Sequence, residues 1–358
     1  MPGKTARSSN LELLRILCML LIIGDHLTGQ GGIADYTTLP SSFAFCLIGC
    51  GSRIACSVFI LIGGWFLCEQ QYKTRRPLSL WLSLWLYTVP VTLLCRLGGL
   101  DVSLGALRWA LFPASTRQLW FISDYLLLLL CVPLLHRLPR AAHRGVLAVL
   151  AVPLLVYPTL FAENGLTGDT AWMFLYEYLL IAYLRRYPDN RLTRLLQRRC
   201  AALLLGLGLP LVNTAVRAVL EMRGLTNGKA FQYIAYYRTA LGALPNLLAA
   251  LALFYLFKGL SLGSVRWINA LSGTTLGVYI LHQIPAFRGF LWNGILQAQA
   301  HHGSVGYTLF AVAAVFLGCA AVDAARTALV MRPLEKTKLF RTLCEKGDAL
   351  AAKITADD

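Results

Sequence analysis

The chain has 358 residues, of which 57% are hydrophobic and 14% are charged. Because soluble domains carry roughly 25% charged residues, this composition excludes a large soluble enzyme and indicates a polytopic membrane protein. A net charge of +16 would suggest a nucleic-acid partner in a soluble protein. Here the basic residues cluster in short loops between apolar runs, which indicates membrane orientation, so we expect no nucleic-acid partner. The ten cysteines mostly lie in apolar runs without a Cys/His ligand set, and we expect no metal cofactor.

Apolar runs recur along the whole chain and predict its fold. A segment inside the hydrocarbon core must satisfy its backbone hydrogen bonds internally, so we expect these runs to be helices. The first run lacks the small-residue cleavage site of a signal peptide and is interpreted as the first span. We predict an all-α membrane protein with about ten transmembrane helices. The runs cover residues 11–28, 43–68, 80–95, 119–135, 145–161, 171–184, 200–220, 239–257, 269–287 and 306–330.

The distribution of basic residues predicts the orientation in the membrane. With the N-terminus, which carries Lys4 and Arg7, placed in the cytoplasm, 22 of the 33 Lys and Arg residues fall in inside segments and 7 fall in outside segments. This asymmetry follows the positive-inside rule. It predicts a multi-pass protein of the cell membrane with both termini in the cytoplasm. Residues 1–335 would form the membrane domain, and residues 336–358 a charged cytoplasmic tail, either amphipathic or frayed.

In the first run, "RILCMLLIIGDH" places a cation, an acid and a base in an apolar segment. Arg15 and His26 are eleven residues apart, about three turns plus 20°, so they share one helical face, roughly 16 Å apart along the axis. Arg15 fits either snorkelling to the lipid phosphates or a face lining a cavity, where ionisable groups in spans usually lie. Asp25 points elsewhere on a regular helix and fits a solvated place at the outer helix end. His26 itself lies close to the outer end of the run.

The second run and the loop after it form the next unusual stretch, "SRIACSVFILIGGWFLCEQQYKTRRPLSLW". The glycine pair Gly63 and Gly64 permits close helix approach or a local break within a span. The basic "KTRR" segment contains Arg75 and Arg76. It fits two alternatives, which are membrane orientation alone and a site for phosphate groups, which arginine binds well.

Two later segments carry further candidate residues. In "RQLWFISDYLLLLLCVPLL", Trp120 indicates an outer membrane interface, where aromatic belts are common, and Asp124 enters the span. In "LSGTTLGVYILHQIP", Thr275, Tyr279 and His282 stand at i, i+4 and i+7 and therefore share a helical face. Back-bonding within the helix explains the threonine and an interfacial position explains the tyrosine, but neither explains the histidine.

Together these four stretches resemble the acyltransferase-3 family of integral membrane acyltransferases. The likeness extends from residue 11 to about residue 330, and the stretches follow the same order as in the family. Ser57 replaces the family's proline, and Gly63 and Thr275 stand where serine is common. The matching residues are Arg15 and His26 in the first stretch, Arg53 and Gly64 in the second, Leu119, Trp120 and Phe121 in the third, and Gly277, Tyr279 and His282 in the fourth.

The resemblance implies transfer of an acyl group to a hydroxyl. The family usually takes acetyl from acetyl-CoA at the cytoplasmic side. Its acceptor is typically a cell-surface or cell-wall glycan, or the lipid-linked precursor of that glycan. We therefore expect acetyl-CoA as the acyl donor, a carbohydrate acceptor and the lipid bilayer as partners, and no metal.

Acyl transfer needs a base for the acceptor proton, a group that stabilises the oxyanion and a held donor. His26 is the candidate base because histidine titrates near neutral pH, and Arg15 is the candidate for the donor's phosphates or pantetheine arm. Direct transfer and an acyl-histidine intermediate are both open. The alternative function is a transporter or flippase with buried Arg and His as a substrate or proton path. The other candidates are Arg53, Arg75 and Arg76 for phosphates at the cytoplasmic mouth, His282 and Tyr279 for the acceptor or oxyanion, and Trp120, Thr275 and Asp25.

Overall fold

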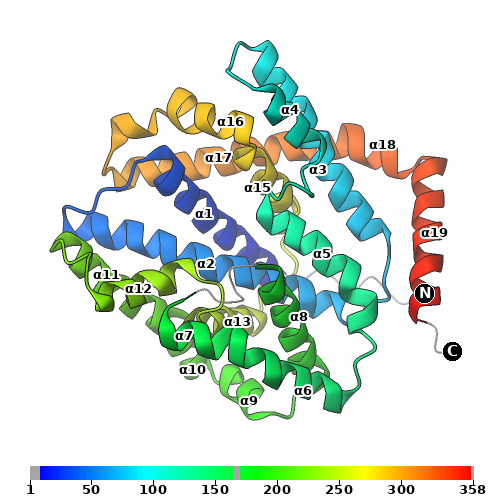
Figure 1. Ribbon diagram of the computed structural model, residues 1–358, viewed down its shortest axis with the longest axis horizontal. Helices are drawn as coiled ribbons and strands as arrows, with labels where there is room; N and C mark the ends of the chain where they lie inside the picture. Colours follow the sequence, from blue (N-terminus) through cyan, green and yellow to red (C-terminus); the bar gives the residue numbers. More distant parts are fainter. Residues whose placement is uncertain (1–8, 164–169, 356–358) are drawn as a thin grey trace.

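A computed structural model describes residues 9–163 and 170–355, and every regular element within these ranges is a helix (Figure 1). The prediction of an all-α protein is therefore confirmed. Lys4 and Arg7, which contributed to the predicted orientation, lie outside the described residues.

The helices follow one another without intervening strands in the described part of the chain. Short π-helical or 3-10 segments interrupt several of the longer ones. The elements are α1 (Ser9–Gly31), α2 (Leu39–Leu67), α3 (Arg75–Leu97), α4 (Leu104–Leu111), α5 (Trp120–Leu135), α6 (Arg140–Ala151), η1 (Val152–Val156), α7 (Tyr157–Phe161), α8 (Thr170–Arg186), α9 (Arg191–Gln197), α10 (Arg199–Leu203), η3 (Leu204–Gly208), α11 (Leu209–Met222), α12 (Lys229–Thr239), α13 (Leu244–Lys258), α14 (Arg266–Ser272), α15 (Thr275–Gln283), α16 (Pro285–Gly289), η4 (Phe290–Ile295), η5 (Ala298–His301), α17 (Val305–Arg326), η6 (Thr327–Met331), α18 (Arg332–Glu335) and α19 (Lys338–Thr355).

Among the described residues, five helical stretches are long and apolar enough to cross a membrane. Two further apolar helices, α5 and α13, are shorter. Such helices are typical of a polytopic membrane protein. The five long stretches and two shorter helices are fewer than the ten spans expected from the apolar runs. The five stretches are Leu39–Leu67, Arg75–Leu97, Arg140–Phe161, Arg199–Met222 and Val305–Glu335.

The expected span over residues 269–287 is wrong as a single helix. The segment is divided into α14, α15 and α16. Gly273 and Thr274 separate the first two, and Pro285 begins the third. Proline lacks a backbone N–H and cannot continue the hydrogen-bonding pattern of the preceding helix. In contrast, the run at 80–95, which is short for a bilayer, belongs to a helix of 23 residues.

The helix α2 forms the centre of the bundle. It packs against α1, α8, α11 and α13, and it runs through the middle of the molecule in Figure 1. In its most apolar window 72% of the residues are buried, against 22% in Arg199–Met222, so α2 belongs to the core and the latter lies nearer the surface of the bundle. Gly64 permits the close approach of α8, because a Cβ there would lie 2.7 Å from Cγ2 of Ile181.

Segments that the sequence assigns to the inside of the membrane meet at one end of the molecule. Arg185, in the last turn of α8, pairs with Glu69, which follows α2, at 2.9 Å. Arg137, after α5, donates to the backbone carbonyl of Ile354 in α19 at 3.2 Å. These contacts join the segment after α2 to the end of α8 and the segment after α5 to the C-terminal helix, and the orientation in the membrane stays a prediction.

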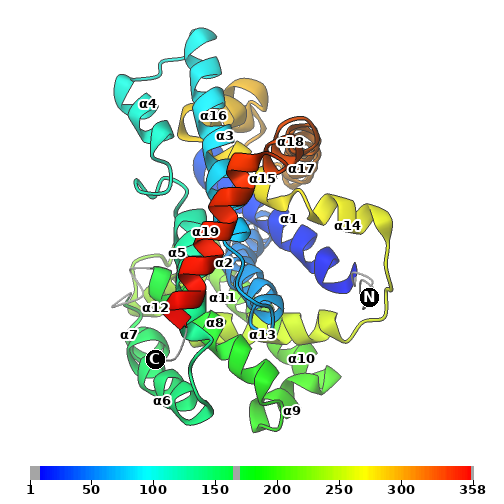
Figure 2. The same cartoon turned by 90° about the vertical axis from the view of Figure 1, so that its right-hand side faces the viewer.

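The C-terminal segment is a packed amphipathic helix. Figure 2 shows α19 lying across the bundle in front of α3 and α5. At its centre a Cβ on Gly347 would meet Thr74, and the Asp348 carboxylate accepts from the backbone N–H of Thr74 at 2.6 Å. The described part of the region after residue 336 is therefore mostly helical, and its place in the cytoplasm stays a prediction.

Candidate active site

An elongated cavity of about 400 Å³ runs through the bundle between α1, α2, α3, α5 and the α14–α15 segment. All four stretches that the sequence singled out contribute to its wall. Along α1 the lining residues are Arg15, Met19 and Ile22, which continue the stripe that ends at His26. The other lining residues include Gly63 from α2, Arg76 and Ser79 from α3, Phe121 and Tyr125 from α5, and Ser272, Thr275 and Tyr279 from the late segment.

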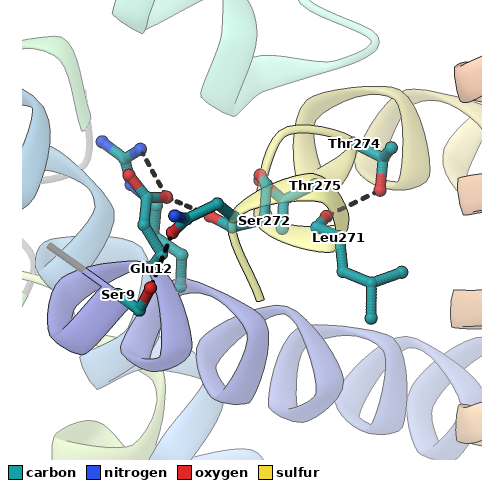
Figure 3. Close-up of polar contacts among 8 residues, drawn as sticks. Ser9, Glu12, Leu271, Ser272, Thr274 and Thr275 are labelled. Carbon is teal, nitrogen blue, oxygen red and sulfur yellow. Dashed lines mark hydrogen bonds and ion pairs between the residues drawn. The ribbon is translucent and has the colours of Figure 1, made fainter. Parts of the chain in front are cut away.

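The Arg15 end of the cavity is a buried polar junction between the first helix and α14. The guanidinium of Arg15 pairs with the Glu12 carboxylate at 3.3 Å. The hydroxyl of Ser272 donates to the same carboxylate, and Figure 3 shows Glu12 and Ser272 pointing toward each other. Sequence reasoning missed Glu12, although it stands three residues before Arg15, a spacing at which helical side chains meet.

A second polar contact holds the same junction one turn earlier. The Ser9 hydroxyl donates to Oδ1 of Asn269 at 3.0 Å. Thr275 also faces this region, since it lines the cavity while its hydroxyl donates to the backbone carbonyl of Ser272 at 2.9 Å. The back-bonding expected for this threonine is therefore present, together with exposure to the cavity.

The side chains of the two arginines in "KTRR" contact different parts of the molecule. Arg76 lines the cavity with Arg15, and its guanidinium donates to the side-chain carbonyl of Gln70. Arg75 points away from this cavity and pairs with Glu335 of α18 at 2.5 Å. Of the two candidates, Arg76 is therefore the one placed beside Arg15.

Aromatic side chains close the opposite end of the cavity. The Tyr279 ring lies 5.7 Å from the ring of Phe121 and 6.3 Å from that of His26, between centroids. The Tyr279 hydroxyl interacts with the backbone N–H of Phe121 in the first turn of α5. Trp120, the expected candidate, does not line the cavity. It packs against Phe121 and Phe174 and supports the aromatic end from behind.

Behind Tyr279 the two candidate histidines form one hydrogen-bonded unit. Nδ1 of His26 lies 2.9 Å from Nε2 of His282. Nδ1 of His282 lies 2.5 Å from the backbone carbonyl of Val278. A carbonyl only accepts, so Nδ1 of His282 carries a proton and Nε2 of the neutral ring accepts from Nδ1–H of His26. The neutral pair therefore leaves Nε2 of His26 unprotonated, and this atom forms no hydrogen bond to any other described residue.

Arg53 lies with the histidines rather than with the phosphate candidates. Its charge, like that of Arg288, acts electrostatically on His26, and its side chain does not line the cavity. Asp25 and Arg53 both act on the thiol of Cys56 in α2. Neither Asp25 nor Arg53 is among the residues that line the cavity beside Arg15, and their roles in the reaction stay predictions.

A polar network that the sequence analysis did not identify holds the far ends of α1 and α15 together. The side-chain amides of Gln30 and Gln283 hydrogen bond to each other at 3.0 Å. The indole N–H of Trp292 donates to Gln30 at 3.1 Å, and the Trp292 ring lies 6.1 Å from that of His282. These contacts fix the helix ends that carry His26 and His282.

No cluster suited to a metal ion accompanies this site. Among residues 9–163 and 170–355, no three His, Cys, Asp or Glu side chains are grouped closely enough to hold one.

The cavity, the paired histidines and the apolar helices together define an integral membrane protein with an internal polar site. The model of the acyltransferase-3 family, described as an acyltransferase domain, matches residues 8–324. The chain therefore belongs to this family of membrane acyltransferases, and the enzyme interpretation is preferred over the transporter. The comparisons found no matching curated protein and no matching solved structure.

Proposed function

We propose that the protein transfers an acetyl group from acetyl-CoA to a hydroxyl of a cell-surface or cell-wall glycan or of its lipid-linked precursor. The single observation that supports this most strongly is the chain from His26 through His282 to the Val278 carbonyl. It leaves one imidazole nitrogen of His26 free to accept a proton, and the His26 ring lies 6.3 Å from the ring of Tyr279, which lines the cavity. A general base must lie close to the proton that it takes and must be held in the right tautomer.

In the proposed reaction, Nε2 of His26 takes the acceptor hydroxyl proton as that oxygen attacks the thioester carbonyl carbon. A C–O bond forms, and the carbonyl oxygen carries the negative charge. The intermediate collapses with cleavage of the C–S bond, and the proton on His26 passes to the departing thiolate. CoA leaves as a thiol, and the histidine is neutral again.

His282 and Tyr279 have supporting roles in this proposal. While His26 is protonated, its Nδ1–H donates a charge-assisted hydrogen bond to His282, and such bonds are roughly twice as strong as neutral ones. In this proposal the oxyanion forms beside Tyr279, which lines the cavity, and the Tyr279 hydroxyl donates to it. The Phe121 N–H, which interacts with the Tyr279 oxygen, orients this hydroxyl.

The donor would enter from the end that carries Arg15 and Arg76. Both guanidiniums face the cavity there, and phosphate is the anion that arginine binds best through paired donors. The thioester would then point toward Tyr279, past the apolar wall formed by Met19 and Ile22. The predicted orientation, with both chain ends in the cytoplasm, gives this entrance access to cytoplasmic acetyl-CoA.

The proposal is tested by mass spectrometry of surface glycans from cells that lack O-acetyl groups. Cells producing the wild-type chain should gain acetyl esters, and cells producing His26→Ala at the same membrane level should not. His143→Gln is the matched control, because His143 is also buried and bonds a backbone carbonyl, that of Leu179, away from the cavity. Unacetylated glycans with the wild-type chain would refute the acceptor, and full acetylation by His26→Ala would refute the base.

A further inference from the structure

A second cavity, of about 550 Å³, lies where the C-terminal helices meet the start of α3. We name it the basic pocket, because five cationic side chains line it: Lys73, Arg75, Arg332, Lys336 and Arg341. Arg332 lies in α18, Lys336 directly follows it and Arg341 lies in α19, and all three come after residue 324, where the match to the family domain ends. The family domain alone therefore does not supply this set of charges.

Three acidic residues, Glu335, Glu345 and Asp348, also line the basic pocket, and two of them hold its walls together. Glu335 pairs with Arg75 at 2.5 Å and accepts from the hydroxyl of Ser79 at 2.8 Å. Asp348 accepts from the backbone N–H of Thr74. These contacts tie α18 and α19 to the beginning of α3 and fix the position of the pocket.

Four of the five cations remain available for a ligand. Within the part of the chain that the structure describes, the side chains of Lys73, Arg332, Lys336 and Arg341 take part in no ion pair or hydrogen bond. Like charges gathered around one cavity repel each other, and a bound anion removes that cost. The chemistry of the pocket therefore favours a multiply charged phosphate ligand.

The basic pocket shares a wall with the cavity of the candidate active site. Arg75 lines the pocket and the next residue, Arg76, lines the cavity. Ser79 also lines the cavity, and it bonds Glu335, which lines the pocket. A donor with its thioester near Tyr279 and its chain passing Arg76 would leave the cavity directly beside these cations.

We propose that the basic pocket binds the phosphates of the nucleotide half of CoA, with the 3′-phosphate held by Lys336 and Arg341. This inference rests on the proposed function for the identity of the donor. The anionic headgroup of a phospholipid carries the same phosphate chemistry, so the experiment must separate the two sources.

The test measures binding of CoA, 3′-dephospho-CoA and pantetheine to the full chain in nanodiscs of zwitterionic phosphatidylcholine. The test variant is Lys336→Gln/Arg341→Gln. The control variant, Lys338→Gln/Lys346→Gln, removes the same charge from exposed positions of α19 that do not line the pocket.

We expect the test variant to raise the Kd for CoA at least tenfold, equivalent to about 1.4 kcal/mol. The test variant should bind CoA and 3′-dephospho-CoA with equal affinity, because removing the cations and removing the 3′-phosphate eliminate the same interaction. Its affinity for pantetheine should be unchanged, and the control should bind all three ligands as the wild type does.

Three results would overturn the inference. In the first, the test variant binds CoA as tightly as the control does. In the second, its affinities for pantetheine and for CoA fall by the same factor. In the third, its affinity for CoA is unchanged and only the rise in melting temperature caused by anionic phosphatidylglycerol is lost. The last result would assign the pocket to a lipid headgroup. A wild-type chain that binds none of the three ligands would instead remove the donor of the proposed function, and this inference with it.

Discussion

Removing the His282 imidazole tests whether this ring supports His26 during the reaction. In His282→Ala, Nδ1–H of His26 loses its acceptor at 2.9 Å, and the tautomer with the proton on Nε2 becomes available. Hydrogen bonds to charged groups contribute about 1.5–3 kcal/mol. If this energy is realised only while His26 is protonated, kcat should fall roughly 10- to 150-fold, since each 1.36 kcal/mol is a factor of ten.

His282→Gln separates orientation from charge stabilisation. The terminal amide oxygen of glutamine can occupy the region of the imidazole Nε2 and accept from His26. We therefore expect a smaller loss of kcat in His282→Gln than in His282→Ala, with an unchanged KM for acetyl-CoA in both. The assay is acetyl transfer from labelled acetyl-CoA by purified protein in nanodiscs, with His143→Gln as control. A kcat within twofold of wild type for His282→Ala at equal folded content would refute the relay.

Three other predictions concern the donor and the packing around the site. Arg15→Gln and Arg76→Gln should each raise the KM for acetyl-CoA about tenfold or more, because each removes one hydrogen bond to a charged group. Steady-state kinetics will measure this change, and an unchanged KM would show that the donor binds elsewhere. Gly277→Ala should destabilise the protein by about 1–3 kcal/mol, because its Cβ would lie 2.1 Å from Oδ1 of Asp323. Gly318→Ala has open space and is the control in thermal unfolding; equal melting temperatures would contradict the close approach. Ser57→Ala should cost about 1–3 kcal/mol, because its hydroxyl is the hydrogen-bond donor, at 2.5 Å, to the buried carboxyl of Glu177; an unchanged melting temperature would show that this contact does not stabilise the fold.

The part of the site on the first helix was predictable from the sequence. The helix is regular over its 23 residues, so angular arithmetic holds from Arg15 to His26. The cavity lining at Arg15, Met19 and Ile22 follows the same stripe. Glu12 was equally accessible to this reasoning. An acid near a helix start also fits the helix dipole alone, so its position in the sequence does not by itself indicate a partner within the span.

Neighbouring residues in a motif were harder to assign. One residue along a helix turns a side chain by about 100°, so Arg75 reaches α18 while Arg76 faces the cavity. The same rotation places Phe121 in the cavity wall and Trp120 behind it. Unless the first residue of the helix is known, a motif does not predict which of two neighbouring side chains faces the cavity.

A hydropathy pattern could not predict the breaks in the segment over residues 266–289. Apolar residues continue through the breaks between α14, α15 and α16, so the pattern indicates one span. The turn at Gly273 and Thr274 is held by contacts to α1, such as that between Ser272 and Glu12, which are 260 residues apart. Long-range contacts of this kind leave no local signal in the sequence.

The contacts between α1 and the α14–α15 segment have a consequence for biosynthesis. They join residues that are 253 to 260 positions apart, including His26 with His282 and Gln30 with Gln283. If α1 inserts as the predicted first span, its buried acid, base and amide are unmatched at first, because their partners are synthesised only after three quarters of the chain. Truncated chains ending before Ser272 should therefore be recognised by membrane quality control as carrying exposed polar groups in lipid, rather than accumulate as stable fragments.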